Sequence, residues 1–250
     1  MQRRRFYAPP ETLVDDSITL SSDESHHLLR VLRLAIGDEI FVFDGCDKEY
    51  RCQFSGVQNR LVVAEVLETL NDIVESPLQL SLAQALIKGE KFDFIVQKAT
   101  ELGVLRIVPL CTEHADIKLN AEQASKRLER WQRISLEALK QSGRRKLVEI
   151  TLPVAIQDFL ESGDEENDSE LIFFNERGGA KLGSVVDSIT NKQIVTAVIG
   201  PEGGWSDNEI NQFNQHSGKG VSLGRRILRT EPAAIAAITL LQYKLGDLSS

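Results

Sequence analysis

The sequence predicts an α/β protein in two parts, a strand-rich segment over residues 1–72 and a segment of alternating strands and helices over residues 76–250. Short β-prone runs separated by tight turns fill the first segment, and apolar strands alternate with helical periodicity in the second. Residues 71–77 are typical of a linker, because Pro77 disfavours helix at Ser76. At 250 residues, the chain is long enough for two domains, or for one large domain.

Five short runs predict strands in the first segment, at residues 6–7, 18–20, 39–43, 50–57 and 61–67. One helix is predicted over residues 23–34, where Leu28 and Leu32 lie at helical spacing. Turn residues such as Gly37 and Gly45 separate the runs. Short strands with tight turns and one helix predict a small barrel or a half-open sheet.

The second segment opens with an apolar strand over residues 78–82. A helix follows, with an apolar face from Phe92 to Leu102, and ends at Gly103. The later elements are strands over residues 105–110, 171–174, 194–199 and 221–223, a long helix over residues 122–141, and a last helix from Thr230. This alternation predicts a parallel sheet covered by helices, in which ligands bind at the carboxyl ends of the strands.

The net charge of −8 and the pI near 5.2 speak against nucleic acid, but the basic residues are clustered. Residues 125–146 hold eight basic and two acidic side chains, and shorter basic clusters stand at residues 3–5 and 225–229. The acidic residues 161–170 are typical of a solvated loop. Each basic cluster alone is typical of a solvated face, whereas three in an acidic chain favour a phosphate-rich partner.

The cysteines and the N-terminus predict a soluble cytoplasmic protein. The three cysteines form no C-x-x-C pair, which argues against a zinc site or a disulfide framework. No apolar run approaches the ~18–20 residues of a membrane span. The N-terminus lacks the apolar core of a secretory signal. We therefore expect no metal and no membrane partner.

A glycine-rich loop follows the strand at residues 194–199 and reads Gly-Pro-Glu-Gly-Gly over residues 200–204. Its backbone amides can approach a ligand closely. Ser206 then caps the next predicted helix, with Glu209 completing a capping box. The loop is neither a P-loop nor a dinucleotide-binding loop. A ligand loop and a plain glycine-rich turn are both open at this point.

A second unusual strand end reads Leu-Gly-Arg-Arg-Ile-Leu-Arg-Thr-Glu-Pro over residues 223–232. Thr230 is the expected N-cap of the last helix, with Pro232 in its first turn, where a missing N–H costs little. Small apolar residues follow from Ala233, so another surface can approach closely. Three arginines at a helix start suit an anion, and the alternative is a basic turn before a buried helix.

Taken together, the two loops resemble the SPOUT class of RNA methyltransferases. The resemblance is carried by Gly-Pro-Glu-Gly-Gly, followed about twenty residues later by Leu-Gly-x-Arg-Ile-Leu-Arg-Thr-Glu. Within that class the chain resembles the RsmE family, bacterial enzymes that methylate N3 of a uridine in 16S ribosomal RNA of the small ribosomal subunit. The likeness runs almost end to end and includes residues 27–33, 43–45, 88–91, 97–103, 131–132 and 141–144.

The resemblance implies a PUA-like β-barrel over residues 1–72 and a SPOUT methyltransferase domain over residues 76–250, with a deep trefoil knot around residues 171–230. It also implies S-adenosylmethionine as the cofactor and a homodimer, for which the helix from Ala233 is the candidate contact. Two residues depart from the family pattern. Pro232 stands where a threonine is common, which removes a hydroxyl. Arg225 stands where proline is common, which adds charge near the cofactor loop.

The cofactor contacts that the resemblance implies, largely through the backbone, are Phe174, Ile199, Gly200, Pro201, Gly203, Gly204, Leu223, Gly224, Ile227, Leu228 and Thr230. The RNA contacts that it implies are Arg3, Arg4, Arg5, His27, Arg30, Arg33, Lys88, Lys91, Arg144 and Arg226. Arginines on the barrel are expected to grip phosphate, a role that does not depend on base sequence. His27 is expected to be either packed or in contact with RNA.

Glu202 and Arg229 are the candidate catalytic residues. Uridine N3 carries a proton at neutral pH, so Glu202 is a candidate base, although its carboxylate could instead tie down the amides of its own loop. Arg229 is placed to stabilise negative charge on the uracil oxygens. Two other readings of the chain stay open: a SPOUT enzyme that acts on another RNA, and a non-catalytic RNA-binding protein.

Overall fold

The residues described by the computed structural model are 3–115, 117–162, 169–189 and 194–249. The chain forms two compact units. Unit 1 consists of Met1–Glu75 and Leu136–Leu147, and unit 2 consists of Ser76–Ser135 and Val148–Ser250. The later segment of unit 1 is a finding of the structure, because nothing in the sequence pattern indicated that it belongs with the first strands.

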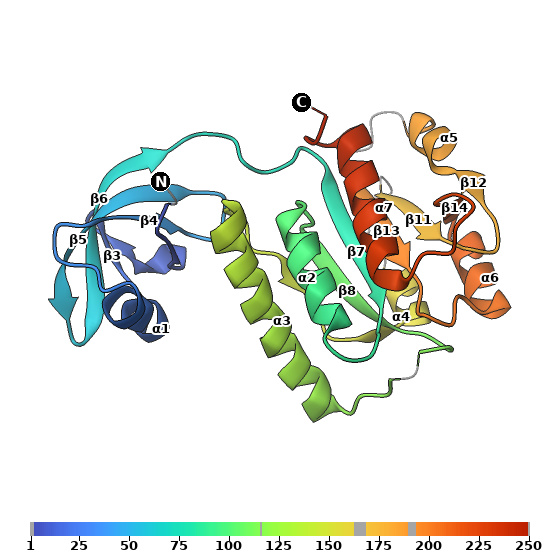
Figure 1. Ribbon diagram of the computed structural model, residues 1–250, viewed down its shortest axis with the longest axis horizontal. Helices are drawn as coiled ribbons and strands as arrows, with labels where there is room; N and C mark the ends of the chain where they lie inside the picture. The colour runs from blue at the N-terminus through green and yellow to red at the C-terminus, as the bar shows by residue number, and fades with distance from the viewer. Residues whose placement is uncertain (1–2, 116, 163–168, 190–193, 250) are drawn as a thin grey trace. The chain divides into compact units, whose positions relative to one another are not determined.

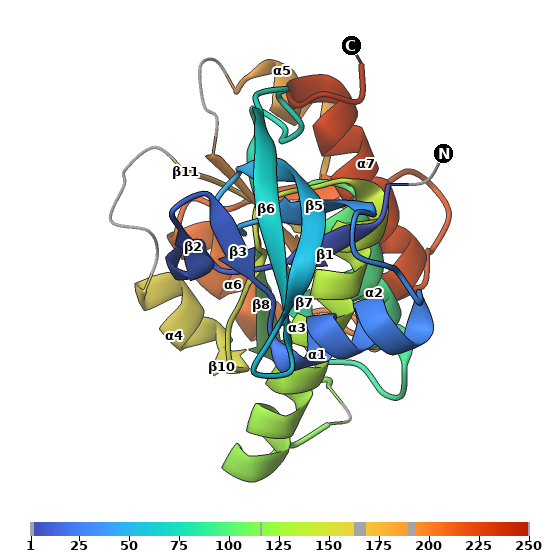
Figure 2. The same cartoon turned by 90° about the vertical axis from the view of Figure 1, so that its left-hand side faces the viewer.

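Unit 1 is built on a six-stranded sheet with the order β1-β4-β5-β6-β3-β2 (Figures 1 and 2). Its strands are β1 (Arg5–Tyr7), β2 (Leu13–Val14), β3 (Ser17–Thr19), β4 (Glu39–Phe43), β5 (Glu49–Gln58) and β6 (Leu61–Leu70). Neighbouring strands run antiparallel, apart from the parallel pair β1 and β4. Each of the five predicted runs overlaps one of these strands, and the two-residue strand β2 was not predicted.

A short helical stretch packs against this sheet. After the turn η1 (Pro10–Thr12), helix α1 (Ser22–His26) continues directly as a π-helical turn, η2 (His27–Val31). The buried Leu28 joins the core formed with Phe6 and Ile40. The helix predicted over residues 23–34 ends early, because Arg33 has a φ of +53°, a left-handed conformation that no helix continues through.

Buried charges attach the end of helix α3 (Ala121–Ser142) to the sheet of unit 1. The Glu49 carboxylate, whose side chain is 2% exposed, accepts a hydrogen bond from Arg5 Nε at 2.6 Å and from Arg145 Nη2 at 3.1 Å. Arg5 also donates to the backbone carbonyl of Leu139 at 2.7 Å. The last residues of α3 are therefore integral to unit 1.

A second buried pair follows the helix. Arg144 Nη2 donates to Glu75 Oε2 at 2.7 Å, and the backbone amides of Arg145 and Lys146 donate to Glu75 Oε1. Burial alone raises the pKa of the Glu75 carboxyl, but the Arg144 hydrogen bonds and charge, together with the two amides, bring that pKa below its ordinary value. Gly143 ends the helix in the left-handed region, with φ at +86°.

Unit 2 is built on an eight-stranded parallel sheet with the order β10-β8-β7-β13-β11-β14-β12, and β9 pairs with β8 outside this path. The strands are β7 (Gln79–Ala85), β8 (Arg106–Cys111), β9 (Glu149–Ile150), β10 (Val154–Ala155), β11 (Ser169–Phe174), β12 (Ala180–Lys181), β13 (Ile194–Ile199) and β14 (Lys219–Ser222). The parallel sheet predicted from alternating elements is confirmed. The two-residue strands β9, β10 and β12 were not predicted.

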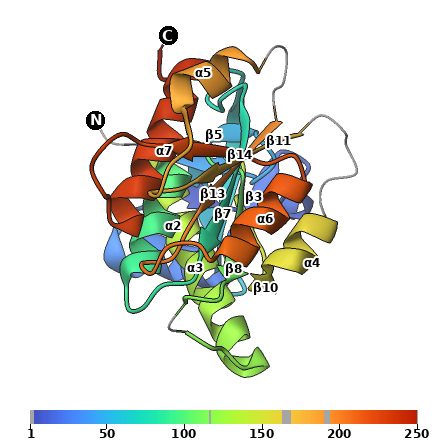
Figure 3. The same ribbon diagram turned by 90° about the vertical axis from the view of Figure 1, so that its right-hand side faces the viewer.

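Helices cover both faces of this sheet (Figure 3). The helices are α2 (Lys91–Glu101), the first part of α3, α4 (Ile156–Glu161), α5 (Leu182–Asp187), α6 (Asp207–Gln215) and α7 (Thr230–Leu245). One core joins α2, α3, α5 and α7 to the sheet, and a second joins α4 and α6 to its other face. Trp131 of α3 is 1% exposed in the first core. None of the described helices has the length and apolarity needed to cross a membrane.

One local prediction is confirmed and two are corrected. Ser206 caps α6, and the predicted capping box with Glu209 is confirmed. The predicted N-cap at Thr230 is wrong, because Arg229 occupies that position and Thr230 is the first helical residue. The acidic stretch 161–170 is only partly a loop, since its first residue ends α4 and its last two lie in β11, while residues 163–168 lie outside the described residues.

Candidate functional site

Three neighbouring strands of unit 2 end at the same edge of its sheet. Strand β11 lies between β13 and β14, and the register pairs Phe174 with Ile199 on one side and with Val221 on the other. Because the strands are parallel, their following loops begin side by side. The structure therefore brings together the two glycine loops singled out in the sequence and the loop after Phe174.

The first glycine loop is pinned to strand β11 by a buried tryptophan. Trp205, 1% exposed, donates from its indole nitrogen to the Phe174 carbonyl at 2.8 Å. A Cβ on Gly200 would lie 3.0 Å from the Trp205 ring, so any larger residue there would require the ring to shift. The Gly204 amide donates back to the Pro201 carbonyl at 3.0 Å, which closes the turn.

The other glycines of this loop also face protein atoms. A Cβ on Gly203 would lie 3.0 Å from that of His114, and one on Gly204 would collide with the Glu176 carboxylate. His114 Nδ1 lies 3.0 Å from the Gly204 carbonyl, an arrangement in which Nδ1 carries the proton and donates. Tight packing against His114 thus favours glycine at position 203, and the left-handed φ of +70° favours it at position 204.

The second loop, which follows β14, is open. Gly224 has a φ of +106°, and a Cβ placed on it would meet no heavy atom within 4 Å. Ile227 is 83% exposed, which is unusual for a large apolar side chain. Arg225, Arg226 and Arg229 are exposed, and within the described residues no ion pair is recorded for them. This loop offers apolar surface and free positive charge.

The start of helix α2 reaches the same place through an ion-paired lysine. Lys91 Nζ forms an ion pair with Glu202 of the first loop and lies 3.9 Å from Glu231 of α7. The hydrogen bond to Glu202 raises the pKa of Lys91 above its ordinary value, so the ammonium stays charged. The hydrogen bond recorded for the Glu202 carboxylate thus goes to another element rather than to amides of its own loop.

Thr230 is committed to protein partners. Its hydroxyl donates to the Gly200 carbonyl at 2.7 Å and accepts from Gln84 Nε2 at 3.2 Å. Gln84, like His114 and Trp205, was not singled out in the sequence. The only signal for Gln84 was an amide within the apolar stretch from Leu82 to Ile87, and Trp205 was visible as the residue that follows the loop.

Unit 1 holds most of the arginines predicted to bind RNA, and the structure contradicts two of these predictions. Arg5 is buried and donates to Glu49 and to three backbone carbonyls, so it cannot grip phosphate. Arg144 is 4% exposed and is paired with Glu75. Both charges hold the end of α3 instead, because each lies beside a carboxylate distant in sequence.

The remaining basic residues of unit 1 are accessible. The side chains of Arg3 and Arg4 are 52% and 49% exposed, with ion pairs to Glu49 at 3.5 Å and to Asp38 at 3.8 Å. Arg30 and Arg33 are exposed, and the exposed apolar residues Val31, Leu32 and Ile36 lie beside them in sequence. His27 packs edge-on against Phe6, with ring centroids 6.0 Å apart, which supports its packed reading.

Family comparisons match both units. Residues 74–242 match the family described as RNA methyltransferase domain, and residues 20–67 match the family described as RNA methyltransferase PUA domain. The described residues hold no cluster of three or more His, Cys, Asp or Glu side chains that could bind a metal ion. The fold and the loops at its sheet edge therefore define an RNA methyltransferase joined to a PUA domain.

The similar proteins carry a more particular name. A relative from Synechocystis sp. is 35% identical over 96% of this chain and 78% of its own length. A relative from Bacillus subtilis is 29% identical over 91% of this chain and 90% of its own length. Both are named ribosomal RNA small subunit methyltransferase E. A Neisseria gonorrhoeae structure of the same name, bound to S-adenosylmethionine, is 32% identical over 98% of this chain and 99% of its own, with a TM-score of 0.88. A Legionella pneumophila structure, described as a methyltransferase with the same cofactor bound, is 34% identical over 99% and 100%, with a TM-score of 0.89. The chain belongs to the ribosomal RNA small subunit methyltransferase E family, which confirms the resemblance and the α/β fold class.

Proposed function

We propose that this protein transfers a methyl group from S-adenosylmethionine to N3 of a uridine in 16S ribosomal RNA. The observation that carries the proposal is the sheet edge of unit 2, where the two glycine loops begin side by side. The second of these loops carries three exposed arginines that form no ion pair among the described residues. Two similar structures, one of them carrying the family's name, have been solved with that cofactor bound. Because ribosomal RNA is its substrate, we place the protein in the cytoplasm.

The residues at this edge fit the cofactor. The candidate contacts are Phe174, Ile199, Gly200, Pro201, Gly203, Gly204, Leu223, Gly224, Ile227, Leu228 and the backbone of Thr230. The open space at Gly224 leaves room for close approach, and the exposed Ile227 supplies an apolar surface that a bound ligand would cover. When bound, the sulfonium cofactor supplies an already activated methyl group, so positioning accounts for much of the catalysis.

Two charged residues of the site have roles in handling the proton on uridine N3. Glu202 is the candidate acceptor of that proton, and its ion pair with Lys91 keeps the carboxylate oriented. Arg229 is the exposed N-cap of helix α7, where its charge can stabilise the uracil oxygens as N3 deprotonates. Lys88 and Arg226 are exposed on loops at this edge and Lys91 is partly exposed at the start of helix α2, so phosphates of the RNA can reach them.

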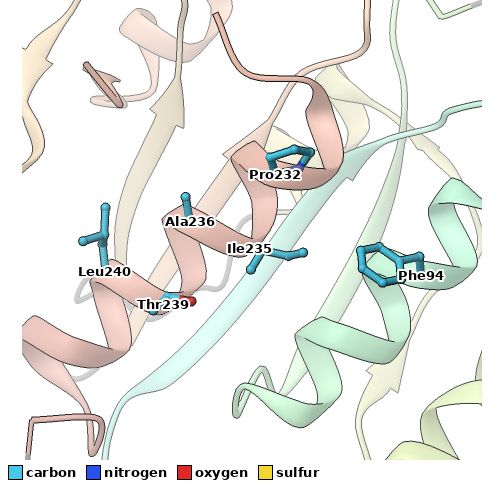
Figure 4. Close-up of a pocket in the computed structure, with 6 residues that line it drawn as sticks. All are labelled: Phe94, Pro232, Ile235, Ala236, Thr239 and Leu240. Carbon is cyan, nitrogen blue, oxygen red and sulfur yellow. The ribbon is translucent and has the colours of Figure 1, made fainter. Parts of the chain in front are cut away.

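We further propose a homodimer through helix α7. An open apolar groove of about 670 Å³ runs along this helix and past α2 (Figure 4). Its lining residues are Phe94, Pro232, Ile235, Ala236, Thr239 and Leu240. Phe94 and Leu240 are 44% and 41% exposed, and a second copy would remove this apolar surface from water.

The dimer is tested by Leu240→Glu, which places a charge in the groove. We expect light scattering to show a monomer for this variant and a dimer for Leu152→Glu, the same change at a position 47% exposed outside the groove. A Leu240→Glu protein that stays dimeric would show that α7 is not the dimer contact.

The chain path between residues 171 and 230, expected to be knotted, includes residues outside the described ranges, so the knot stays a proposal.

Two measurements test the function itself. Calorimetric binding of S-adenosylmethionine separates a methyltransferase from a non-catalytic RNA-binding protein, for which we would see no binding heat. Mass spectrometry of ribosomal RNA from cells lacking the protein should show the loss of 3-methyluridine from 16S RNA. An unchanged 3-methyluridine level would refute the assignment and direct attention to another RNA.

A further inference from the structure

A buried glutamine reaches the cofactor loop through a chain of hydrogen bonds. Gln84 is fully buried near the end of strand β7, and the sheet register places it opposite Ile199, the residue just before the glycine loop. Its Nε2 donates to the Ala85 carbonyl at 3.0 Å and to Thr230 Oγ1 at 3.2 Å. Thr230 in turn donates to the Gly200 carbonyl at 2.7 Å.

The direction of every bond in this chain is determined. The carbonyls of Ala85 and Gly200 can only accept, so the single hydroxyl proton of Thr230 goes to Gly200. The Thr230 oxygen must then accept from the amide nitrogen of Gln84, which also settles which end of that amide carries the nitrogen. The chain therefore joins strand β7, the first residue of α7 and the first residue of the glycine loop.

Stability alone does not explain an amide at this position. Gln84 Oε1 is buried, and no hydrogen-bond partner is recorded for it in the described part of the chain. A buried acceptor without a partner costs free energy, and the same strand carries leucine at buried positions such as Leu80 and Leu82. An apolar residue would avoid that cost but would leave the Thr230 oxygen without its donor.

We propose that Gln84 is a positioning residue of the cofactor site, which orients the Thr230 hydroxyl and through it fixes the Gly200 carbonyl. The inference rests on the proposed function, since it assigns the loop at residues 200–204 to S-adenosylmethionine. Where a ligand is bound largely by backbone groups, the placement of each peptide sets the affinity. Gln84 thus acts on the cofactor without touching it.

The test compares Gln84→Leu with Gln79→Leu, the same change at the exposed start of the same strand. We expect Gln84→Leu and Thr230→Val each to weaken S-adenosylmethionine binding by about 3- to 10-fold in calorimetry, the range for one lost hydrogen bond. Thr230→Ser, which keeps the hydroxyl, should restore near wild-type affinity. The double variant Gln84→Leu/Thr230→Val should bind no more weakly than Thr230→Val alone, because both changes break one chain.

A readout without the cofactor separates this inference from the proposed function. Hydrogen exchange of amides 203–205 should become faster in Gln84→Leu and stay unchanged in Gln79→Leu. If the wild-type protein bound no S-adenosylmethionine, the proposed function would be refuted. Faster hydrogen exchange in Gln84→Leu would still show that Gln84 stabilises the loop. Wild-type affinity and exchange in Gln84→Leu would overturn the inference. So would a loss in Thr230→Val that Thr230→Ser does not rescue.

Discussion

Replacing Glu49 by glutamine should destabilise unit 1 far more than one lost surface charge would. The Glu49 side chain is 2% exposed and lies between Arg5 and Arg145, whose side chains are 4% and 1% exposed. Glutamine has nearly the same shape, so the change removes charge without leaving a cavity. Its amide group would also turn two hydrogen-bond donors toward guanidinium groups that can only donate.

The magnitude follows from the partners that each arginine keeps. Removing one member of a buried ion pair costs about 3–5 kcal/mol, because the other charge stays buried without compensation. Arg5 keeps three backbone carbonyl acceptors, and Arg145 keeps Asp72 Oδ1 at 2.6 Å. We therefore expect a cost near the lower end, about 3 kcal/mol. With a urea slope of about 2–3 kcal/mol/M, the unfolding midpoint should fall by roughly 1–1.5 M.

The assay is urea unfolding followed by circular dichroism, with hydrogen exchange in β5 as a local readout. The control is Glu68→Gln in the same sheet, where the carboxylate is 55% exposed and contacts Arg51 at 3.0 Å. Exposed pairs contribute about 0–1 kcal/mol, so its midpoint should move little. Equal midpoint shifts in the two variants would refute the reasoning that burial makes Glu49 important.

Three further predictions concern charge. Arg3→Ala/Arg4→Ala should weaken RNA binding and leave cofactor affinity unchanged. The slope of log binding constant against log salt concentration should become shallower by about 0.7–0.9 per lost phosphate contact, and an unaltered slope would contradict this. Arg229→Gln should mainly lower the single-turnover rate while RNA affinity falls less, and equal losses in both quantities would mean that its charge serves binding instead. The lowered pKa of Glu75 means that the stability it contributes is present above its ordinary pKa near 4.5 and is lost as the pH falls through the lower folded value. Glu75→Gln should therefore flatten the pH dependence of unfolding below about pH 4.5, and an unchanged acid profile would exclude Glu75 as its source.

Elements that are specified locally were predictable from the sequence. Strand β13 and the capping box at Ser206 follow from short-range patterns, and the structure has both as predicted. The cap of α7 was misplaced by one residue. Threonine is a favoured N-cap, but here its hydroxyl bonds Gly200, a residue brought beside it by the sheet.

Features set by long-range partners were not predictable. A run of three arginines is typical of a solvated cluster, yet strand β1 turns Arg5 inward toward Glu49 while Arg3 and Arg4 remain accessible. The glycine loops could be predicted from the sequence, because few other residues can replace glycine in such turns. Gln84 was not found, because its partner Thr230 lies 146 positions along the chain.

The discontinuity of unit 1 has a consequence for synthesis on the ribosome. The chain leaves unit 1 after Glu75 and returns to it only at Leu136–Leu147, so 72 further residues must be made before the unit is complete. At about 5–20 residues per second, that interval lasts roughly 4–14 s. During it, strands β1 to β6 exist without Arg144 and Arg145, and the carboxylates of Glu49 and Glu75 lack those buried partners. A nascent chain halted between these points would contain an incomplete unit 1. Strands β1 to β6 transferred alone into another protein would also lack the buried partners Arg144 and Arg145.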